Sequence, residues 1–118
     1  MALQTVKIVE KPWGEERMLT ETEKYIVKIL CINAWHRLSK QYHRVKDDTL
    51  WLLEGKAPVE FNGDSNSQMI VGLSRMVSLR IFPGTIHRIS AREDTKILEV
   101  STGEGDDVVR LEDDYQRI

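Results

Sequence analysis

The chain has 118 residues, of which 31% are charged and 41% hydrophobic, and its formal net charge at pH 7 is −2. This length provides for one domain with its own core, and a weakly acidic chain lacks the excess of basic residues that nucleic acids and anionic membranes attract. No run approaches the roughly 18 apolar residues that cross a membrane, and residues 1–7 lack the apolar stretch of a signal peptide. We therefore expect a cytoplasmic protein that binds neither nucleic acid nor membrane.

Short segments rich in Ile, Val, Leu, Tyr and Trp follow one another along the chain, at 24–33, 49–54, 57–61, 68–73, 77–82, 86–91 and 95–101. Residues typical of turns separate them, at 54–56, 62–67, 83–84 and 92–94. Short strands at intervals of about 8–12 residues predict a sandwich or closed barrel, and no window keeps a helical period. The sequence predicts one all-β domain over 1–118, with an N-terminal arm at 1–10 and an acidic segment at 104–118 that packs on the barrel.

The single cysteine and the tryptophans bear on the core and on assembly. Cys31 has no partner for an internal disulfide, and its apolar segment predicts a buried core thiol. Each of Trp13, Trp35 and Trp51 suits either an exposed platform for a sugar or a place in the core or an interface. Because Trp51 shares one strand face with Leu53 while Leu50 and Leu52 form the other, segment 49–53 is apolar on both sides. A homodimer that covers the outer side is expected.

Two stretches about 30 residues apart carry the candidate chemistry. The first reads Gln-x-His-x4-Asp-x6-Gly from Gln41 to Gly55, and the second reads Pro-Gly-x2-His and ends at His87. Gln41 and His43 lie two apart on a strand and therefore share a face, and Asp48 joins them if the chain folds over at 44–47. Two imidazoles and a carboxylate suit Fe(II), Mn(II), Ni(II), Co(II) or Zn(II). The predicted metal ligands are Gln41, His43, Asp48 and His87.

These stretches resemble the two motifs of the cupin superfamily and, more narrowly, the C-terminal cupin domain of type II mannose-6-phosphate isomerases and its stand-alone relatives. The matching segments are Lys-Pro-Trp-Gly at 11–14, Leu-Ser-Lys-Gln-Tyr-His at 38–43, Pro-Gly-Thr-Ile-His-Arg at 83–88, Leu-Glu-Val at 98–100 and the acidic run at 106–115. The resemblance covers residues 11–117. In the general first motif, Trp35 replaces a Gly, Gln41 a His and Asp48 a Glu; in the second, the replacements are Met76, Phe82 and Ala91.

The resemblance implies a double-stranded β-helix, or jelly-roll barrel, and metal-dependent aldose–ketose isomerisation of a sugar phosphate. Such a reaction needs an electrophile, a base and cations for the phosphate. Arg37, Lys46 and Arg88 are the candidate substrate-binding residues, with Lys40 as a further cation, although Arg88 points away from His87 in a strand and suits a packing or dimer role. Lys28 and Glu99, in apolar segments, are candidates for the base or for an internal ion pair.

Two other functions remain open from the sequence alone. The altered motif also suits a cupin without catalytic activity that binds a sugar or small anion. The third possibility is an Fe(II) oxygenase that uses His43, His87 and Asp48 as its ligands. Fold alone does not decide among them, because one fold hosts many activities.

Overall fold

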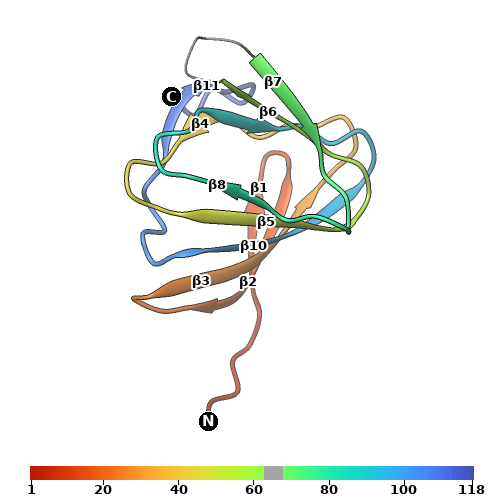
Figure 1. The fold of residues 1–118 in the computed structure, drawn as a ribbon. Helices are drawn as coiled ribbons and strands as arrows, with labels where there is room; N and C mark the ends of the chain where they lie inside the picture. Colours follow the sequence, from red (N-terminus) through yellow and green to blue (C-terminus); the bar gives the residue numbers. More distant parts are fainter. Residues whose placement is uncertain (63–67) are drawn as a thin grey trace.

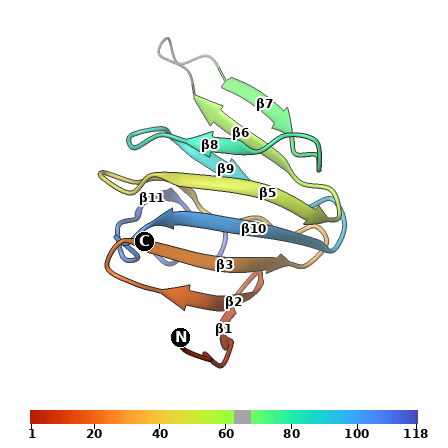
Figure 2. The same cartoon turned by 60° about the horizontal axis from the view of Figure 1, so that its bottom comes forward.

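The computed structural model describes residues 1–62 and 68–118 and consists of two antiparallel sheets that face each other (Figure 1). The six-stranded sheet has the order β1 (Lys7–Lys11), β2 (Gly14–Glu21), β3 (Tyr25–Ile32), β10 (Thr95–Thr102), β5 (Asp48–Glu54) and β8 (Leu79–Ile81). The five-stranded sheet has the order β11 (Val109–Glu112), β4 (Lys40–Tyr42), β9 (His87–Ile89), β6 (Pro58–Asn62) and β7 (Gln68–Gly72). Figure 2 shows β3, β10 and β5 side by side.

The all-β prediction is confirmed, and each of the seven apolar segments contains a strand. The strand expected at Gln41 is β4, whereas the sequence did not reveal β1, β2 and β11. Strand β1 takes in residues 7–10 of the expected N-terminal arm, and β11 lies within the acidic segment. Except for Asn62, the expected turn at 62–67 lies outside the described residues. No helix that could cross a membrane is found in the part of the chain that the structure describes.

The core lies between the sheets because each strand alternates its side chains. In the six-stranded sheet, Leu50 and Ile97 point inward and are fully buried, and Val59 and Ile89 meet them from the opposite sheet. The expected core position of Cys31 is wrong. Its neighbours on both sides, Leu30 and Ile32, face the core, so the thiol points outward and is half-buried.

The outer face of the six-stranded sheet is apolar along its middle. Ile29 of β3 is paired with Leu98 of β10, which is paired in turn with Trp51 of β5. Val100 lies beside this row, and Trp51 and Val100 are 38% and 39% exposed. In the single chain, therefore, one face of this sheet covers the core and the other presents an apolar band to solvent.

The C-terminal segment is bound to the barrel by strand pairing and by two arginines. Strand β11 pairs with β4, and the Arg37 guanidinium donates to both carboxylate oxygens of Asp114, at 2.7 and 2.8 Å. Arg88 is buried, donates from Nε to the Leu38 carbonyl at 3.0 Å and pairs with Glu112 at 3.4 Å. These contacts hold residues 109–114 against the five-stranded sheet.

Glycine is required at Gly55, where the chain turns after β5 with φ of +97°. A Cβ there would lie 2.5 Å from the Asp94 carbonyl oxygen and 2.5 Å from Thr95 Oγ1. Gly84 also has a positive φ, +85°, but a Cβ added there would meet no atom within 4 Å beyond its chain neighbours. An alanine at Gly84 would therefore introduce backbone strain alone, whereas an alanine at Gly55 would introduce the same strain and a steric collision.

We expect Gly84→Ala to lower the free energy of unfolding by about 1–2 kcal/mol, the cost of a left-handed alanine. Gly55→Ala is expected to cost about 1–3 kcal/mol more, because it adds a collision with backbone atoms to the same strain. Urea denaturation of both variants and the wild type measures the difference. Equal losses for the two variants would contradict the packing described around Gly55.

Candidate functional site

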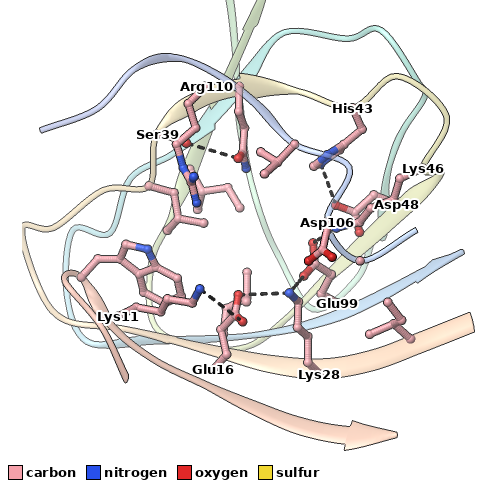
Figure 3. Close-up of a pocket in the computed structure, with 18 of the residues that line it drawn as sticks. Lys11, Glu16, Lys28, Ser39, His43, Lys46, Asp48, Glu99, Asp106 and Arg110 are labelled. Atoms are coloured by element: carbon pink, nitrogen blue, oxygen red, sulfur yellow. Dashed lines mark hydrogen bonds and ion pairs between the residues drawn. The ribbon is translucent and has the colours of Figure 1, made fainter. Parts of the chain in front are cut away.

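A cavity of about 230 Å³ lies between the two sheets and is lined by side chains from both (Figure 3). All four predicted metal ligands, Gln41, His43, Asp48 and His87, line it, and so do Lys28, Lys46 and Glu99. Gln41 lies opposite His87 in the pairing of β4 with β9, and His43 follows two residues after Gln41. The five-stranded sheet therefore supplies the imidazoles and the amide, and the six-stranded sheet supplies the carboxylates.

The two imidazoles are oriented in the same way. Nδ1 of His43 donates to the Asp107 carbonyl at 2.6 Å, and Nδ1 of His87 donates to the Thr85 carbonyl at 2.9 Å. A carbonyl only accepts, so each Nδ1 carries the hydrogen and each Nε2 keeps a lone pair. The ring centroids are 5.3 Å apart, and Nε2 of His43 is buried without a hydrogen-bond partner among the described residues. Metal-binding histidines have this arrangement.

Burial keeps both rings neutral. It lowers the pKa of His43 below the ordinary value, against the opposing effect of the hydrogen bond to Asp107. The pKa of His87 falls to about 4, chiefly through burial, with a contribution from neighbouring His43. At neutral pH both side chains are therefore in the form that binds a metal ion.

Asp48 is the ligand candidate whose environment differs most from a simple metal site. Its carboxyl is buried, Oδ2 lies 3.8 Å from Nε2 of His43, and Oδ1 has no hydrogen-bond partner among the described residues. Burial, then the charge and hydrogen bond of Glu99, raise the pKa of Asp48 to about 9. In residues 1–62 and 68–118 no group of three or more His, Cys, Asp and Glu side chains forms a ready metal site. The two imidazoles, with Nε2 of His43 unpartnered in the described part of the chain, are suited to bind a metal ion. The Asp48 carboxyl can bind one only after it loses its proton.

A row of alternating charges lines the wall of the six-stranded sheet. Nζ of Lys28 lies 3.0 Å from Glu16 and 3.4 Å from Glu99, and Nζ of Lys46 lies 4.0 Å from Glu99. Burial alone would raise the pKa of Glu99, but Lys46, the hydrogen bond from Asp48 and Lys28 outweigh it and lower the pKa to about 2. Glu99 is thus ionised and Asp48 protonated, since the cations lie closest to Glu99.

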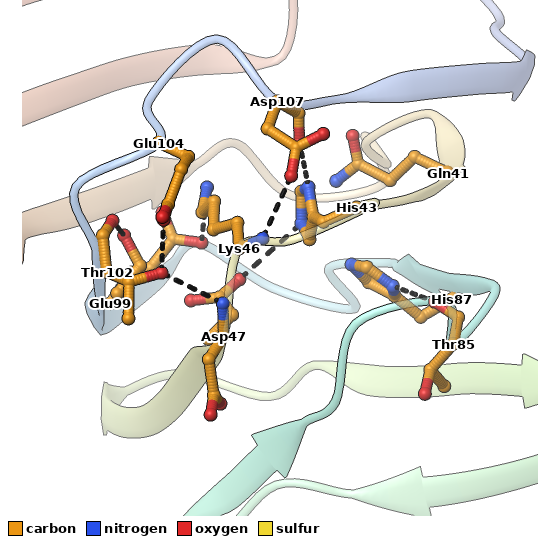
Figure 4. A network of polar contacts seen from close by, with 12 residues as sticks. Gln41, His43, Lys46, Asp47, Thr85, His87, Glu99, Thr102, Glu104 and Asp107 are labelled. Atoms are coloured by element: carbon orange, nitrogen blue, oxygen red, sulfur yellow. Dashed lines mark hydrogen bonds and ion pairs between the residues drawn. The ribbon is translucent and has the colours of Figure 1, made fainter.

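Asp107 organises the loop that brings His43 and Lys46 to the cavity (Figure 4). Its carboxylate accepts hydrogen bonds from the backbone N–H groups of Arg44, Val45 and Lys46 at 3.1, 2.7 and 2.9 Å. Those three bonds lower the pKa of Asp107 to about 2. Because its carbonyl also holds His43, this one residue fixes both the loop and the imidazole.

Of the predicted substrate-binding residues, the structure brings only Lys46 to the cavity. Arg37 and Arg88 bind the C-terminal carboxylates instead, and Lys40 is absent from the cavity lining as well. Arg88 follows His87 on β9, so its side chain leaves the opposite face of the sheet. Strand alternation from His87 predicted that Arg88 points away from the candidate metal site, which agrees with the structure, whereas spacing did not determine the faces of Arg37, Lys40 and Lys46.

The sequence analysis gave no chemical role to several residues that line the cavity: Lys11, Glu16, Ser39, Asp106 and Arg110. Trp13 is buried in the core and forms part of the cavity wall. Arg110 lies between Val109 and Leu111 on β11. This alternation of apolar and charged residues is the sequence signal that could have indicated a strand with Arg110 on the opposite face from Val109 and Leu111.

Comparisons with known proteins agree with this architecture. The family model of the mannose-6-phosphate isomerase C-terminal domain matches residues 1–113. Mannose-1-phosphate guanylyltransferase ManC of Salmonella typhimurium is 30% identical over 115 residues, which are 93% of this chain and 23% of that protein. The chain therefore spans about a quarter of this curated relative.

Solved structures share the fold at low sequence identity. Oxalate decarboxylase OxdC of Bacillus subtilis has a TM-score of 0.78 at 16% identity, and the match covers 90% of this chain and 30% of that one. The capsular polysaccharide assembling protein CapF of Staphylococcus aureus has a TM-score of 0.71 at 15% identity, over 97% and 31%. KdgF from Halomonas has a TM-score of 0.70 at 13% identity, over 85% and 88%. At these identities the likeness establishes the fold alone.

The predicted cupin fold and the predicted relationship are both confirmed by these matches. The chain belongs to the family of mannose-6-phosphate isomerase C-terminal domains, which are cupins.

Proposed function

We propose that this cupin domain is a metal-dependent isomerase that interconverts an aldose phosphate and a ketose phosphate. The observation that carries the proposal is the pair of buried, neutral imidazoles, His43 and His87, each with Nδ1–H held by a backbone carbonyl. The family is named for an enzyme of mannose 6-phosphate, and ManC is named for mannose 1-phosphate. These names support a sugar phosphate as the ligand.

The residues that would hold the metal are His43 and His87, with Gln41 and Asp48 beside them in the cavity. When bound, a divalent Mn, Fe, Co, Ni or Zn ion supplies a Lewis acid that polarises the substrate carbonyl. For Asp48 to bind, its carboxyl must release the proton that burial and Glu99 hold on it. Metal uptake therefore becomes stronger as pH rises.

Glu99 is the group to which we assign the transfer of the proton. In the reaction a C–H bond breaks on the carbon beside the carbonyl, and a C–H bond forms on the former carbonyl carbon. The hydroxyl proton of the first carbon passes to the former carbonyl oxygen, so that a new carbonyl and a new hydroxyl result. The Glu99 carboxylate is buried, ionised and faces the cavity, so it can accept that proton and return it to the neighbouring carbon. Lys28 and Lys46 beside it stabilise the negative charge that develops on the substrate oxygens.

Elemental analysis tests whether the protein binds a metal ion through these histidines. After loading with Mn, Fe, Co, Ni or Zn at pH 8, we expect one transition metal ion per wild-type chain and almost none in His87→Ala, which lacks one imidazole. His36→Ala is the matched control, because His36 is a partly buried histidine that stacks near Tyr115 instead of lining the cavity. An equal metal content in both variants, or none in the wild type, would remove the metal from the proposal.

An activity assay tests whether the protein catalyses the isomerisation. Wild-type protein is expected to convert mannose 6-phosphate to fructose 6-phosphate, and Glu99→Gln is expected to lower kcat by about 10²–10⁴-fold, because the amide cannot carry the proton. Glu16→Gln is the control, since it removes the other carboxylate that contacts Lys28. Binding of the sugar phosphate without turnover would instead favour a binding module, and oxygen uptake by the iron-loaded protein would favour an Fe(II) oxygenase.

We also propose that two copies of the chain pair through the outer face of the six-stranded sheet. The apolar band there contains Ile29, Leu98 and Trp51 in adjacent paired positions. Ion pairs of mixed sign flank the band, Glu15–Arg17 and Glu54–Lys96 on one side and Asp47–Arg80 on the other. A surface with both signs at its rim can be complementary to a second copy of itself.

Analytical ultracentrifugation at micromolar concentration is expected to find a dimer for the wild type. Trp51→Glu should yield a monomer, because it places a charge in the middle of the apolar band. Lys24→Glu serves as a control for added negative charge, because Lys24 is exposed in the turn between β2 and β3 and belongs neither to the apolar band nor to its flanking ion pairs. A monomeric wild type at this concentration would disprove the pairing.

A further inference from the structure

Three side chains form one row across the inner face of the five-stranded sheet. Strand pairing sets Arg110 of β11 opposite Gln41 of β4, and Gln41 opposite His87 of β9. Residues paired in this way point to the same side of a sheet, and all three line the cavity. With neighbouring strands about 4.8 Å apart, the backbones of Arg110 and His87 are about 10 Å apart. Arg110 thus lies next to Gln41 and two strand spacings from His87.

Arg110 differs from the arginines that hold the C-terminal segment. Arg37, Arg88 and Arg117 each pair with a carboxylate. For Arg110, no hydrogen bond or ion pair is found among residues 1–62 and 68–118, and its Nε is buried without a partner. Arg110 is half-buried, and its enclosed Nε–H lacks a hydrogen-bond acceptor within the described chain, which leaves a donor group unsatisfied. A bound anion would supply that acceptor.

The other charges of the cavity favour an anion beside Arg110. Figure 3 shows Ser39 beside Arg110, whereas Asp48 and Glu99 lie on the opposite side with Lys28 and Lys46 close to them. The hydroxyl of Ser39 donates to Gln41 at 3.2 Å. On that opposite side the carboxylate of Glu99 already compensates the charges of Lys28 and Lys46, whereas no carboxylate is found paired with Arg110 in the described residues. The Arg110 guanidinium is therefore the cation left to attract an anion.

We propose that Arg110 binds the phosphate group of the ligand and thereby points its carbon chain toward His43 and His87. The planar guanidinium can donate two parallel hydrogen bonds to phosphate oxygens. This inference rests on the proposed function for the class of ligand, a sugar phosphate. Its test, however, requires neither a metal nor turnover.

Isothermal titration calorimetry with mannose 6-phosphate, in a chelator and without metal, measures the contribution of Arg110. We expect Arg110→Gln to bind about 10- to 100-fold more weakly than the wild type, the loss typical of hydrogen bonds to a charged group. Arg110→Lys keeps the charge without the planar fork and should lie between them. Arg92→Gln is the matched control, because Arg92 is an exposed arginine in the turn at 92–94 and does not line the cavity. Mannose without phosphate should bind the wild type and Arg110→Gln equally weakly.

A second measurement uses the wild type alone, in case Arg110→Gln does not fold. The Arg110 Nε–H signal in a ¹⁵N-correlated NMR spectrum should shift when mannose 6-phosphate or inorganic phosphate is added. An unchanged signal at saturation, or equal affinity of folded Arg110→Gln and wild type, would overturn the assignment. If Arg110→Gln binds the sugar phosphate as tightly as the wild type and the wild type turns it over, this inference is refuted and the isomerase proposal stands. If binding depends on Arg110 but the wild type shows no turnover, this inference stands and the isomerase proposal is refuted.

Discussion

The site depends on the docking of the C-terminal segment against the loop after β4. Strand β4 has only three residues and lies between β9 and β11, so by itself it would hold its side chains poorly. Asp107 provides the support: its carboxylate accepts three backbone N–H groups of residues 44–46, and its carbonyl fixes the imidazole of His43. Arg37 and Arg88 secure the same segment from the outside through Asp114 and Glu112. A part of the chain distant in sequence thus sets the geometry of the first motif.

A contribution to folding stability does not explain the charged side chains inside the cavity. Lys28 lies between Glu16 and Glu99, and Lys46 reaches Glu99 at 4.0 Å. Removing such groups from water costs free energy that their attraction only partly offsets, and apolar replacements are often as stable. The core of Leu50, Val59 and Ile97 shows that this barrel packs well with apolar side chains. A row of buried charges at one end, next to neutral histidines, is better explained by a polar ligand.

The fold and the site were predictable from the sequence to different degrees. Short apolar segments bounded by turn residues, such as 49–54 and 95–101, were recognisable as strands. Strand β2 was not, since Glu15, Glu16 and Arg17 hide its period, and Glu16 turns out to face a cavity that accepts charge. The motif spacing located Gln41, His43, Asp48 and His87 at one cavity. Strand alternation placed Arg88 on the face away from His87, in agreement with the structure. Spacing could not bring Arg110 to the cavity, because its face depends on the register of a strand, β11, that the sequence did not reveal.

The departure at Asp48 changes the electrostatics of the site as well as its length. A glutamate there, one methylene longer, would reach further from β5 toward the imidazoles of the opposite sheet. The shorter Asp48 side chain lies 3.8 Å from His43 and close enough to Glu99 to share a hydrogen bond with it. Two carboxyl groups so placed cannot both be ionised, and the cations Lys28 and Lys46 keep the charge on Glu99. Among the departures from the general cupin pattern, Asp48 is therefore the one that holds a proton between the imidazoles and the buried charges.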